Sequence, residues 1–403
     1  MPRRLQRDDW QSVRDQFALD PDIAHFAAYV LASPPKPVRD AIERHRRGLD
    51  ADTAGYLERL SDTPVRRAAA GYLGARPDEI ALTASTTSGL GIVYGGLDLQ
   101  PADDVLTTEH DFFSTHEALR RAAHRTGATV NRVRLYDDPS AADAGEIIER
   151  LMEGITSNTR AVAITWVHSS TGVKLPISAI SDAMAEHNDR GGSAQPVLLF
   201  VDGIHGVGVE NATVGELGCD VLVSGTHKWL WGPRGTGIVW AKEAAWASIA
   251  GETPPFEQVH FDAWLDDTEP ARVRGGLANT PGGYVAFEHR AALAEAFQFH
   301  EFVGKAAIAE RTHSQATQLK EGLADIDGLR TVTPMSTDLS SGMVCVAIPE
   351  PHLFEVMEQL SDERFSTSIT PYIEHFMRIG PSIVTTPEQV DDLLSALRRL
   401  VKP

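Results

Sequence analysis

Two residues with chemistry to offer, Asp202 and Lys228, directly follow apolar stretches typical of buried strands. Asp202 ends the run VLLFVD, and Lys228 follows VLVSGTH about twenty residues later. The carboxyl ends of parallel strands meet at one edge of an open α/β sheet, where ligands bind. A lysine beside a buried strand is costly unless it is paired, or neutral as an amine or imine. The pair suits pyridoxal phosphate (PLP), because an aspartate holds the pyridinium proton and a lysine forms the imine. The alternative is a structural aspartate and a surface lysine.

Longer segments around this pair carry a family resemblance. VDGIHGVGVE (201–210) and SGTHKWLWGPRGTGIVWA (224–241) resemble the class-V aminotransferase superfamily of PLP fold type I. The likeness is greatest to the isopenicillin N epimerase-like branch, which is related to cysteine desulfurases and cysteine C–S lyases. It extends from FAAYVLASPPKPV to RIGPSIVTTPEQVDDLL, nearly the whole chain. The resemblance implies a PLP enzyme with a large domain, a small C-terminal domain and an active site shared between two subunits of a homodimer.

The resemblance also assigns roles around the cofactor. Asp202 is the expected partner of the pyridinium nitrogen, His205 the neighbour of the phenolic oxygen, and Lys228 the imine-forming lysine. Residues 84–89 form a Ser/Thr-rich turn between a strand and a helix, where backbone amides bind phosphate, although such turns also serve simply as helix caps. Matched to the family, the expected phosphate contacts are Thr86, Thr87, Ser88, His227 and, from the partner subunit, Thr280.

One position departs from the family pattern. Relatives commonly have a serine three residues before the lysine, whereas this chain has Gly225. Ser224 or Thr226 is therefore expected to make the contact instead.

The remaining candidates concern the ring and the substrate. His110 and Phe112 compete as the residue that stacks on the ring, and Phe112 could instead be a core residue. His168 and Ser169 follow another strand in what resembles the substrate-facing loop. His168 is a candidate second acid or base, against the alternative of a histidine that is only hydrogen-bonded.

Arg378 is the expected clamp for the substrate carboxylate, because a guanidinium binds a carboxylate through two hydrogen bonds. The alternative is an ordinary salt bridge of Arg378 with Glu374 or a neighbouring acid. Arg272 and Arg274 are the alternative cations for the carboxylate.

Some residues are discounted. Lys174 is the nearest rival to Lys228, but no aspartate precedes it at the matching spacing. No metal is expected, since His110, Asp111 and His116 do not have the spacing of a zinc site. Cys219 and Cys345, the two cysteines, lie in or beside apolar strands and are expected to be buried. The persulfide-forming cysteine of a desulfurase is therefore missing.

The elements that must position these residues alternate between short apolar runs and helical segments, which predicts crossover units and a mostly parallel sheet. An N-terminal arm (1–30), a large PLP-binding domain (31–285) and linking helices with a small α+β domain (286–403) are expected. The predicted strands of the large domain span 80–83, 104–107, 129–133, 161–167, 197–201 and 221–223, and those of the small domain 342–347 and 377–380.

The composition of the chain limits the classes of molecule that it is expected to bind. The net charge of −19 argues against nucleic acid or an anionic membrane as the main partner. The chain shows no secretory signal and no apolar run long enough to span a membrane, and with its low cysteine content a cytoplasmic protein is expected.

The function expected from all this is a PLP enzyme that acts on a substituted amino acid in biosynthetic tailoring. Removal of the Cα proton, followed by epimerisation or by β C–S cleavage of an S-substituted cysteine, is favoured. A decarboxylating oxidation that uses O2 is the alternative within the cofactor class. A cofactor-free α/β binding scaffold is the alternative of another kind.

Overall fold

The central element of the fold is a seven-stranded sheet with the order β2-β8-β7-β6-β5-β3-β4. The computed structural model describes residues 5–6, 9–193, 195–270, 275–349 and 352–401. All neighbouring strands are parallel except β8, which runs antiparallel to both β2 and β7. The mostly parallel sheet is as predicted. Its strands are β2 (Ile80–Thr83), β3 (Asp104–Thr108), β4 (Thr129–Val133), β5 (Thr159–Thr165), β6 (Leu198–Asp202), β7 (Val221–Gly225) and β8 (Gly237–Ala241).

In the large sheet β3, β6 and β7 lie within two residues of their predicted bounds, whereas β8 and β5 differ more from the sequence prediction, β5 by two residues at both ends. The sequence pattern does not predict strand β8, because the short run GIVWA follows a glycine-rich segment and does not continue the strand–helix alternation. Strand β5 ends at Thr165 rather than at Val167, which forms an isolated bridge with Lys174. Thr165 is therefore the last residue of its strand, level with the end of β6.

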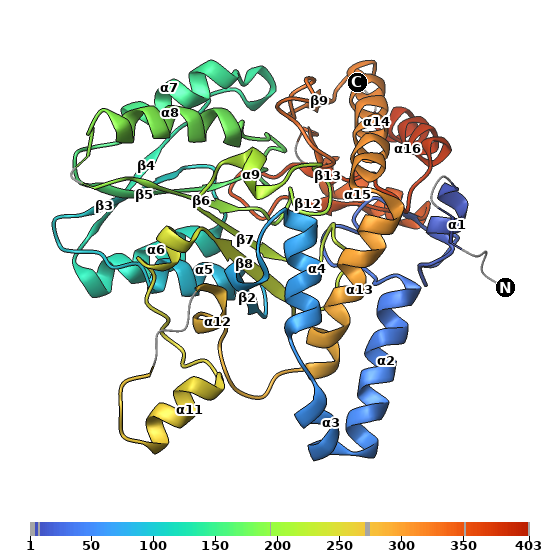
Figure 1. Cartoon of the computed structure of the whole chain (residues 1–403). Helices are drawn as coiled ribbons and strands as arrows, with labels where there is room; N and C mark the ends of the chain where they lie inside the picture. The colour runs from blue at the N-terminus through green and yellow to red at the C-terminus, as the bar shows by residue number, and fades with distance from the viewer. Residues whose placement is uncertain (1–4, 7–8, 194, 271–274, 350–351, 402–403) are drawn as a thin grey trace.

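Helices cover both faces of this sheet (Figure 1). Side chains of β5 alternate between the faces: Val162 and Ile164 join one core cluster, and Ala161 and Ala163 join the other. This period of two is what a strand buried on both sides requires. The covering helices are α7 (Ala144–Glu153), α8 (Ile177–Asp189) and α9 (Val214–Leu217) on one face, and α5 (Thr86–Gly95) and α6 (Phe113–Thr126) on the other.

A second group of helices stands beside the sheet. The long helix α13 packs against α2 and α4. Helix α11 projects away from the body at the lower left of Figure 1. None of the helices within the described ranges is long and apolar enough to cross a membrane. The remaining helices before residue 304 are α1 (Trp10–Arg14), α2 (Lys36–Ala51), α3 (Thr53–Arg59), α4 (Thr63–Leu73), α10 (Glu243–Trp246), α11 (Gln258–Leu265), α12 (Gly275–Ala278) and α13 (Phe287–Val303). Of these, α12 contacts β2 and β8 of the large sheet, and α10 contributes to the core on one of its faces.

The C-terminal part forms a smaller antiparallel sheet with the order β12-β13-β10-β9. The N-terminal segment packs against this C-terminal part: β1 (Ala24–His25) pairs with β11 (Phe365–Ser366) in a separate two-stranded parallel sheet, and Phe26 lies in the core of the small domain. Helices α13 and α14 are separated at Gly304, whose φ of 102° is a conformation that favours glycine. The other elements are β9 (Arg330–Thr331), β10 (Val344–Ala347), β12 (Ser368–Ile369), β13 (Met377–Ile379), α14 (Lys305–Ala324), α15 (His352–Asp362) and α16 (Pro387–Leu400).

Candidate active site

A cavity of about 250 Å³ lies where the large and small sheets meet, at the carboxyl ends of β5 and β6. Larger cavities exist elsewhere, including one of about 480 Å³, but this one contains both Asp202 and Lys228. Its walls come from three places: the strand ends, the start of helix α5, and the segment from β12 to β13. The lining residues are Ser85, Thr86, Thr87, Phe112, Ser114, Thr165, Ser169, Asp202, Ile204, His205, His227, Lys228, Pro371 and Arg378.

Asp202 and Lys228 are both buried in this cavity, and burial moves both pKa values toward neutrality. Desolvation raises the pKa of Asp202 to about 7, against the hydrogen bond from the Ile204 amide and the charge of Lys228. That amide donates to Oδ1 over 3.0 Å. Desolvation lowers the pKa of Lys228 to about 8, while Asp202 opposes the shift. Each group is therefore poised to gain or lose its charge near neutral pH.

His205 lines the cavity beside Lys228. Its Nε2 is 3.0 Å from Nζ of Lys228, and its Nδ1 accepts a hydrogen bond from the indole of Trp229 over 3.2 Å. Burial, and after it the charge of Lys228, hold the pKa of His205 well below its usual range. His205 is neutral in this setting.

The N-terminus of α5 forms the end of the cavity where a phosphate would be expected. Ser85 caps the helix by accepting a hydrogen bond from the Ser88 amide over 3.1 Å, and Thr86 and Thr87 line the cavity. The Ser88 hydroxyl instead donates back to the Ser85 carbonyl over 2.9 Å and is not part of the lining. The Ser88 hydroxyl therefore does not face the space where the phosphate is expected, contrary to the prediction for this side chain.

The glycine that replaces the family's serine has a structural reason. A Cβ atom at Gly225 would lie 2.9 Å from the ring of His227 and 3.0 Å from Oγ1 of Thr86. The neighbouring hydroxyls do not take over, because Ser224 Oγ donates to the Gly225 carbonyl over 2.9 Å and Thr226 Oγ1 pairs with Thr236 Oγ1 over 2.5 Å. Neither side chain lines the cavity, so the structure corrects the expectation that Ser224 or Thr226 substitutes.

The structure separates the two candidates for stacking on the ring. Phe112 lines the cavity, whereas the ring of His110 stacks on Tyr136, with centroids 3.9 Å apart and an angle of 13°. His168 is fully buried, and its Nδ1 lies 2.9 Å from the Tyr136 hydroxyl. Burial lowers the pKa of both His110 and His168 to about 3. Neither histidine lines the cavity, so the structure gives His168 no access to a substrate there.

Arg378, on strand β13, reaches the cavity from the small sheet and is 8% exposed. Its Nε donates to Ser368 Oγ over 3.3 Å, and its guanidinium carbon lies 5.8 Å from the ring centroid of Tyr29. Among the described residues no carboxylate forms an ion pair with it, so the alternative of a salt bridge with Glu374 is wrong. Arg272 and Arg274 lie outside the described residues.

Several residues near the cavity were not found from the sequence. Thr165 lines it, and its buried Oγ1 has no hydrogen-bond partner in the described part of the chain; its place at the end of a parallel strand was the available signal. Asp111 ties β3 to β5 by accepting hydrogen bonds from Thr108 and from the Thr165 amide. Tyr372 hydrogen-bonds to Ser169 over 2.8 Å and packs edge-on against Phe112. No sequence pattern marked Tyr372, because a loop of the small domain carries it to the cavity.

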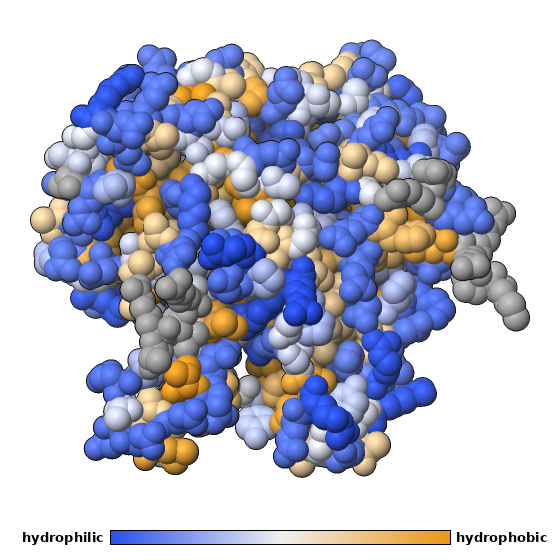
Figure 2. Space-filling model, in the orientation of Figure 1, coloured by the Kyte–Doolittle hydropathy of each residue, from blue (hydrophilic) through white to orange (hydrophobic). Residues whose placement is uncertain are grey.

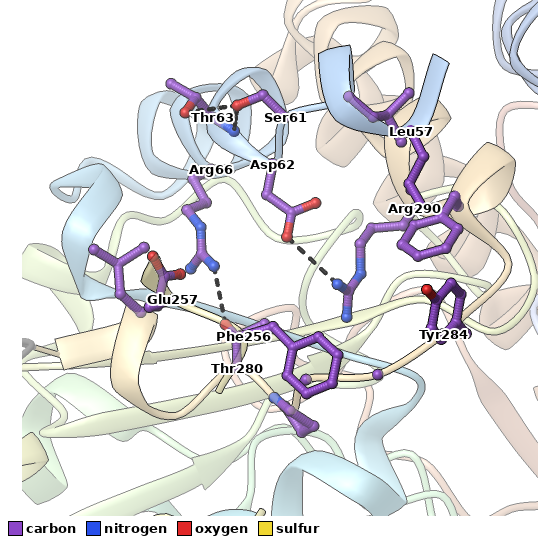
Figure 3. A pocket seen from close by; sticks show the side chains of 16 residues that line it. Leu57, Ser61, Asp62, Thr63, Arg66, Phe256, Glu257, Thr280, Tyr284 and Arg290 are labelled. Atoms are coloured by element: carbon purple, nitrogen blue, oxygen red, sulfur yellow. Dashed lines mark hydrogen bonds and ion pairs between the residues drawn. The ribbon is translucent and has the colours of Figure 1, made fainter. Parts of the chain in front are cut away.

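Thr280 lies in a different cavity from Lys228 (Figure 3). It is buried, donates to the Gly276 carbonyl over 2.8 Å and accepts hydrogen bonds from the Leu82 amide and from Arg66. Thr280 therefore does not line the cavity that holds Lys228 of its own chain.

The cavity fits pyridoxal phosphate on three observations. Asp202 is a buried carboxyl that, among the described residues, accepts one hydrogen bond to its side chain, and it needs a cationic or proton-donating partner. Lys228 has the lowered pKa that imine formation requires. The amino end of a helix, with Thr86 and Thr87, faces the same space and suits a phosphate.

Comparisons with known proteins agree with this chemistry. The aminotransferase class-V family model matches residues 61–393. The chain is 26% identical to an isopenicillin N epimerase of Amycolatopsis lactamdurans, over 98% of this chain and 99% of that protein. It is 23% identical to a probable cysteine desulfurase of Pyrococcus abyssi, over 97% of this chain and 98% of that protein.

The structure of the chain also superimposes on solved structures. A mutant of C-DES with glycine covalently linked to its PLP cofactor superimposes with a TM-score of 0.84 at 21% identity, covering 96% of this chain and 98% of that one. Cysteine desulfurase of Thermococcus onnurineus gives a TM-score of 0.80 at 18% identity, with 99% of both chains covered. The family match over most of the length identifies the chain as a member of the class-V aminotransferase family, whose cofactor is pyridoxal phosphate.

Proposed function

We propose that this protein removes the Cα proton of an amino acid bound to pyridoxal phosphate, leading to epimerisation or to cleavage of the Cβ–S bond of an S-substituted cysteine. The observation that carries the proposal is the presence of Lys228 and of Arg378, a buried guanidinium without an acidic partner among the described residues, in one cavity of about 250 Å³. Such a cavity holds a small substrate between a base and a carboxylate clamp.

Arg378 binds the substrate carboxylate in this proposal. A buried guanidinium is stable only if its donors are satisfied, and among the described residues only Ser368 Oγ accepts a hydrogen bond from Arg378. A planar carboxylate satisfies the remaining donors in a two-pronged arrangement. Because Arg378 sits on the small sheet, substrate binding also connects the two parts of the chain.

Asp202, Phe112 and the start of α5 hold the cofactor in this proposal. Asp202 binds the ring nitrogen, Phe112 lies against the ring, and the turn at Thr86 and Thr87 takes the phosphate with His227. When bound, the cofactor stabilises the negative charge that develops at the substrate Cα. A charged Asp202 favours a protonated ring nitrogen, and a cationic partner in turn lowers its pKa from the raised value of the free site.

Lys228 moves the proton. With its pKa lowered to about 8, a useful fraction of its amine is neutral at neutral pH and can accept the Cα proton at Nζ. Epimerisation requires that a second donor, such as water, protonates Cα on the face opposite to Lys228, while Lys228 keeps the proton that it removed. In β-cleavage the Cβ–S electron pair leaves with sulfur, and water completes the conversion to a thiol, pyruvate and ammonia without any oxidant.

The relatives support both outcomes, since they include an isopenicillin N epimerase and a solved cystine C–S lyase. The cysteines argue against a desulfurase of the persulfide-forming kind. Cys219 and Cys345 are both buried and free, and burial raises the pKa of each thiol to about 12. Neither supplies an accessible thiolate.

The test is to incubate the PLP-loaded protein with amino acids and S-substituted cysteines in deuterium oxide, in air and under nitrogen. Deuterium incorporation at Cα, with inverted product or with pyruvate and thiol, in both atmospheres is the expected result. Carbon dioxide and peroxide that form only in air would replace the proposal by the oxygen-dependent decarboxylating oxidation. Absence of Cα exchange with any amino acid would refute it.

We also propose that the protein works as a homodimer with Thr280 reaching the partner's cofactor. Support comes from exposed apolar side chains on and near α11, where Trp264 is 75% and Tyr284 85% exposed. Phe256, Phe261 and Leu265 are exposed there as well, and Figure 2 shows a few hydrophobic residues among mostly hydrophilic ones on this projection. A surface of this kind marks an interaction site, and it borders the cavity that Thr280 lines. A fully active protein that light scattering shows to be a monomer at the assay concentration would refute the shared site.

A further inference from the structure

Trp229 follows the lysine directly and contacts the residue beside it in space, His205. Trp229 is 2% exposed. Its indole Nε1 donates to Nδ1 of His205 over 3.2 Å, while Nε2 of the same imidazole lies 3.0 Å from Nζ of Lys228. One buried chain of contacts thus runs from the indole through the imidazole to the amine.

The chemical nature of the indole determines which group donates and which accepts in each of these two contacts. An indole N–H only donates, so Nδ1 of His205 must be the unprotonated acceptor. A neutral imidazole then has its proton on Nε2, which faces Lys228. This N–H can donate to a neutral amine, but it opposes an ammonium, which has donors only. The tautomer of His205 therefore favours the neutral form of Lys228.

The indole itself is held in place by the N-terminal segment. The ring of Tyr29 stacks on Trp229 with centroids 5.1 Å apart and an angle of 9°. A Cβ at Gly380 would lie 2.3 Å from the Tyr29 ring, and one at Gly342 would lie 3.0 Å from the indole. The small sheet thus leaves room for both rings, and the orientation of the indole N–H is set by packing.

We propose that Trp229 is a positioning residue that keeps the proton of His205 on Nε2 and thereby keeps the Lys228 amine uncharged and ready to react. The inference rests on the proposed role of Lys228 and adds Trp229 to it. The ionisable groups that act on or contact His205 are Lys228, Arg378 and His227, together with Tyr29, whose ring meets the imidazole edge-on at 6.0 Å. Asp202 favours the charged form of Lys228, whereas Arg378 opposes it. Removing the indole donor should shift the protonation equilibrium of Lys228 from the neutral amine toward the ammonium form.

The first experiment measures the tautomer directly. Nitrogen-15 NMR of histidine-labelled, full-length protein should show His205 with an unprotonated Nδ1 and a protonated Nε2, the signals being assigned by their loss in His205→Gln. A protonated Nδ1 would overturn the proposal, and this result does not depend on how any tryptophan variant folds.

The second experiment measures the reactivity of Lys228 without turnover. Protein stripped of cofactor is mixed with PLP, and the rate of imine formation is followed by absorbance as a function of pH. In Trp229→Phe the midpoint should move up by about one pH unit and the rate at neutral pH should fall about tenfold. The matched control is Trp240→Phe, which removes a buried indole that is bonded to Glu79 and should leave the midpoint unchanged.

The outcomes separate the two proposals. A folded Trp229→Phe protein with the midpoint of the parent would refute the role of Trp229 while leaving Lys228 in place. Failure of the unmodified protein to form the imine would refute the proposed function and with it this inference, whatever the tautomer of His205.

Discussion

Replacing Asp202 by asparagine should stabilise the cofactor-free protein and disable the loaded enzyme. The folded carboxyl has a pKa of about 7, compared with 3.8 for an unperturbed group. Because the folded pKa is raised, the ionised group destabilises the fold most above pH 7, and the cost falls as the pH drops. It amounts to about 4 kcal/mol at pH 8 and about 2 kcal/mol at pH 5.

Asparagine removes this charge at nearly the same volume, and its carbonyl can still accept the hydrogen bond from the Ile204 amide. The NH2 group of asparagine is a donor that needs a hydrogen-bond partner, whereas the carboxylate has no donor. Leaving this group unsatisfied reduces the gain in the free energy of unfolding by roughly 1–2 kcal/mol. We therefore expect Asp202→Asn to raise the free energy of unfolding by about 2–3 kcal/mol at pH 8 and to have little effect at pH 5. Urea denaturation of the cofactor-free protein at the two pH values measures both quantities.

Asp111 provides the matched control, since it is equally buried but accepts hydrogen bonds from Thr107, Thr108 and the Thr165 amide. Asp111→Asn should destabilise the protein at both pH values, because the amide cannot accept all of these bonds. With PLP bound, Asp202→Asn should lose activity by orders of magnitude. A destabilised Asp202→Asn protein at pH 8, or one with near-normal turnover, would show that the carboxylate of Asp202 is structural.

Three further predictions concern the same cavity. Lys228→Ala should keep the far-UV circular dichroism of the parent but form no borohydride-reducible link to PLP, and full activity in this variant would exclude Lys228 as the reacting lysine. Arg378→Lys keeps the charge but loses the two-pronged geometry, so KM for amino acids should rise tenfold or more; unchanged substrate binding in Arg378→Ala would assign the carboxylate to another cation. Mixing Lys228→Ala with a disabling Thr280 variant should restore part of the activity in hybrid dimers, measured after co-refolding, and no recovery would count against a site shared between subunits.

The parallel-sheet scaffold and the central pair of residues could be predicted from the amino-acid sequence. Apolar runs that end in a polar residue are recognisable without an alignment, and parallel strands necessarily bring their carboxyl ends to one edge of the sheet. The strand pattern alone therefore places Asp202 and Lys228 together. Strand β8 illustrates the limit, because a short antiparallel strand between glycines has neither the length nor the alternation that identifies its neighbours.

Which side chains share the cavity depends on packing between distant segments and could not be predicted from local patterns. His110 and Phe112 are two residues apart, and packing of His110 against Tyr136 leaves Phe112 at the cavity. Gly225 is explained by the space that His227 and Thr86 occupy, which no local pattern reveals. The contact of Tyr29 with Trp229 joins segments far apart in the chain, so its effect on His205 depends on how the N-terminal segment and the small sheet close over the large one.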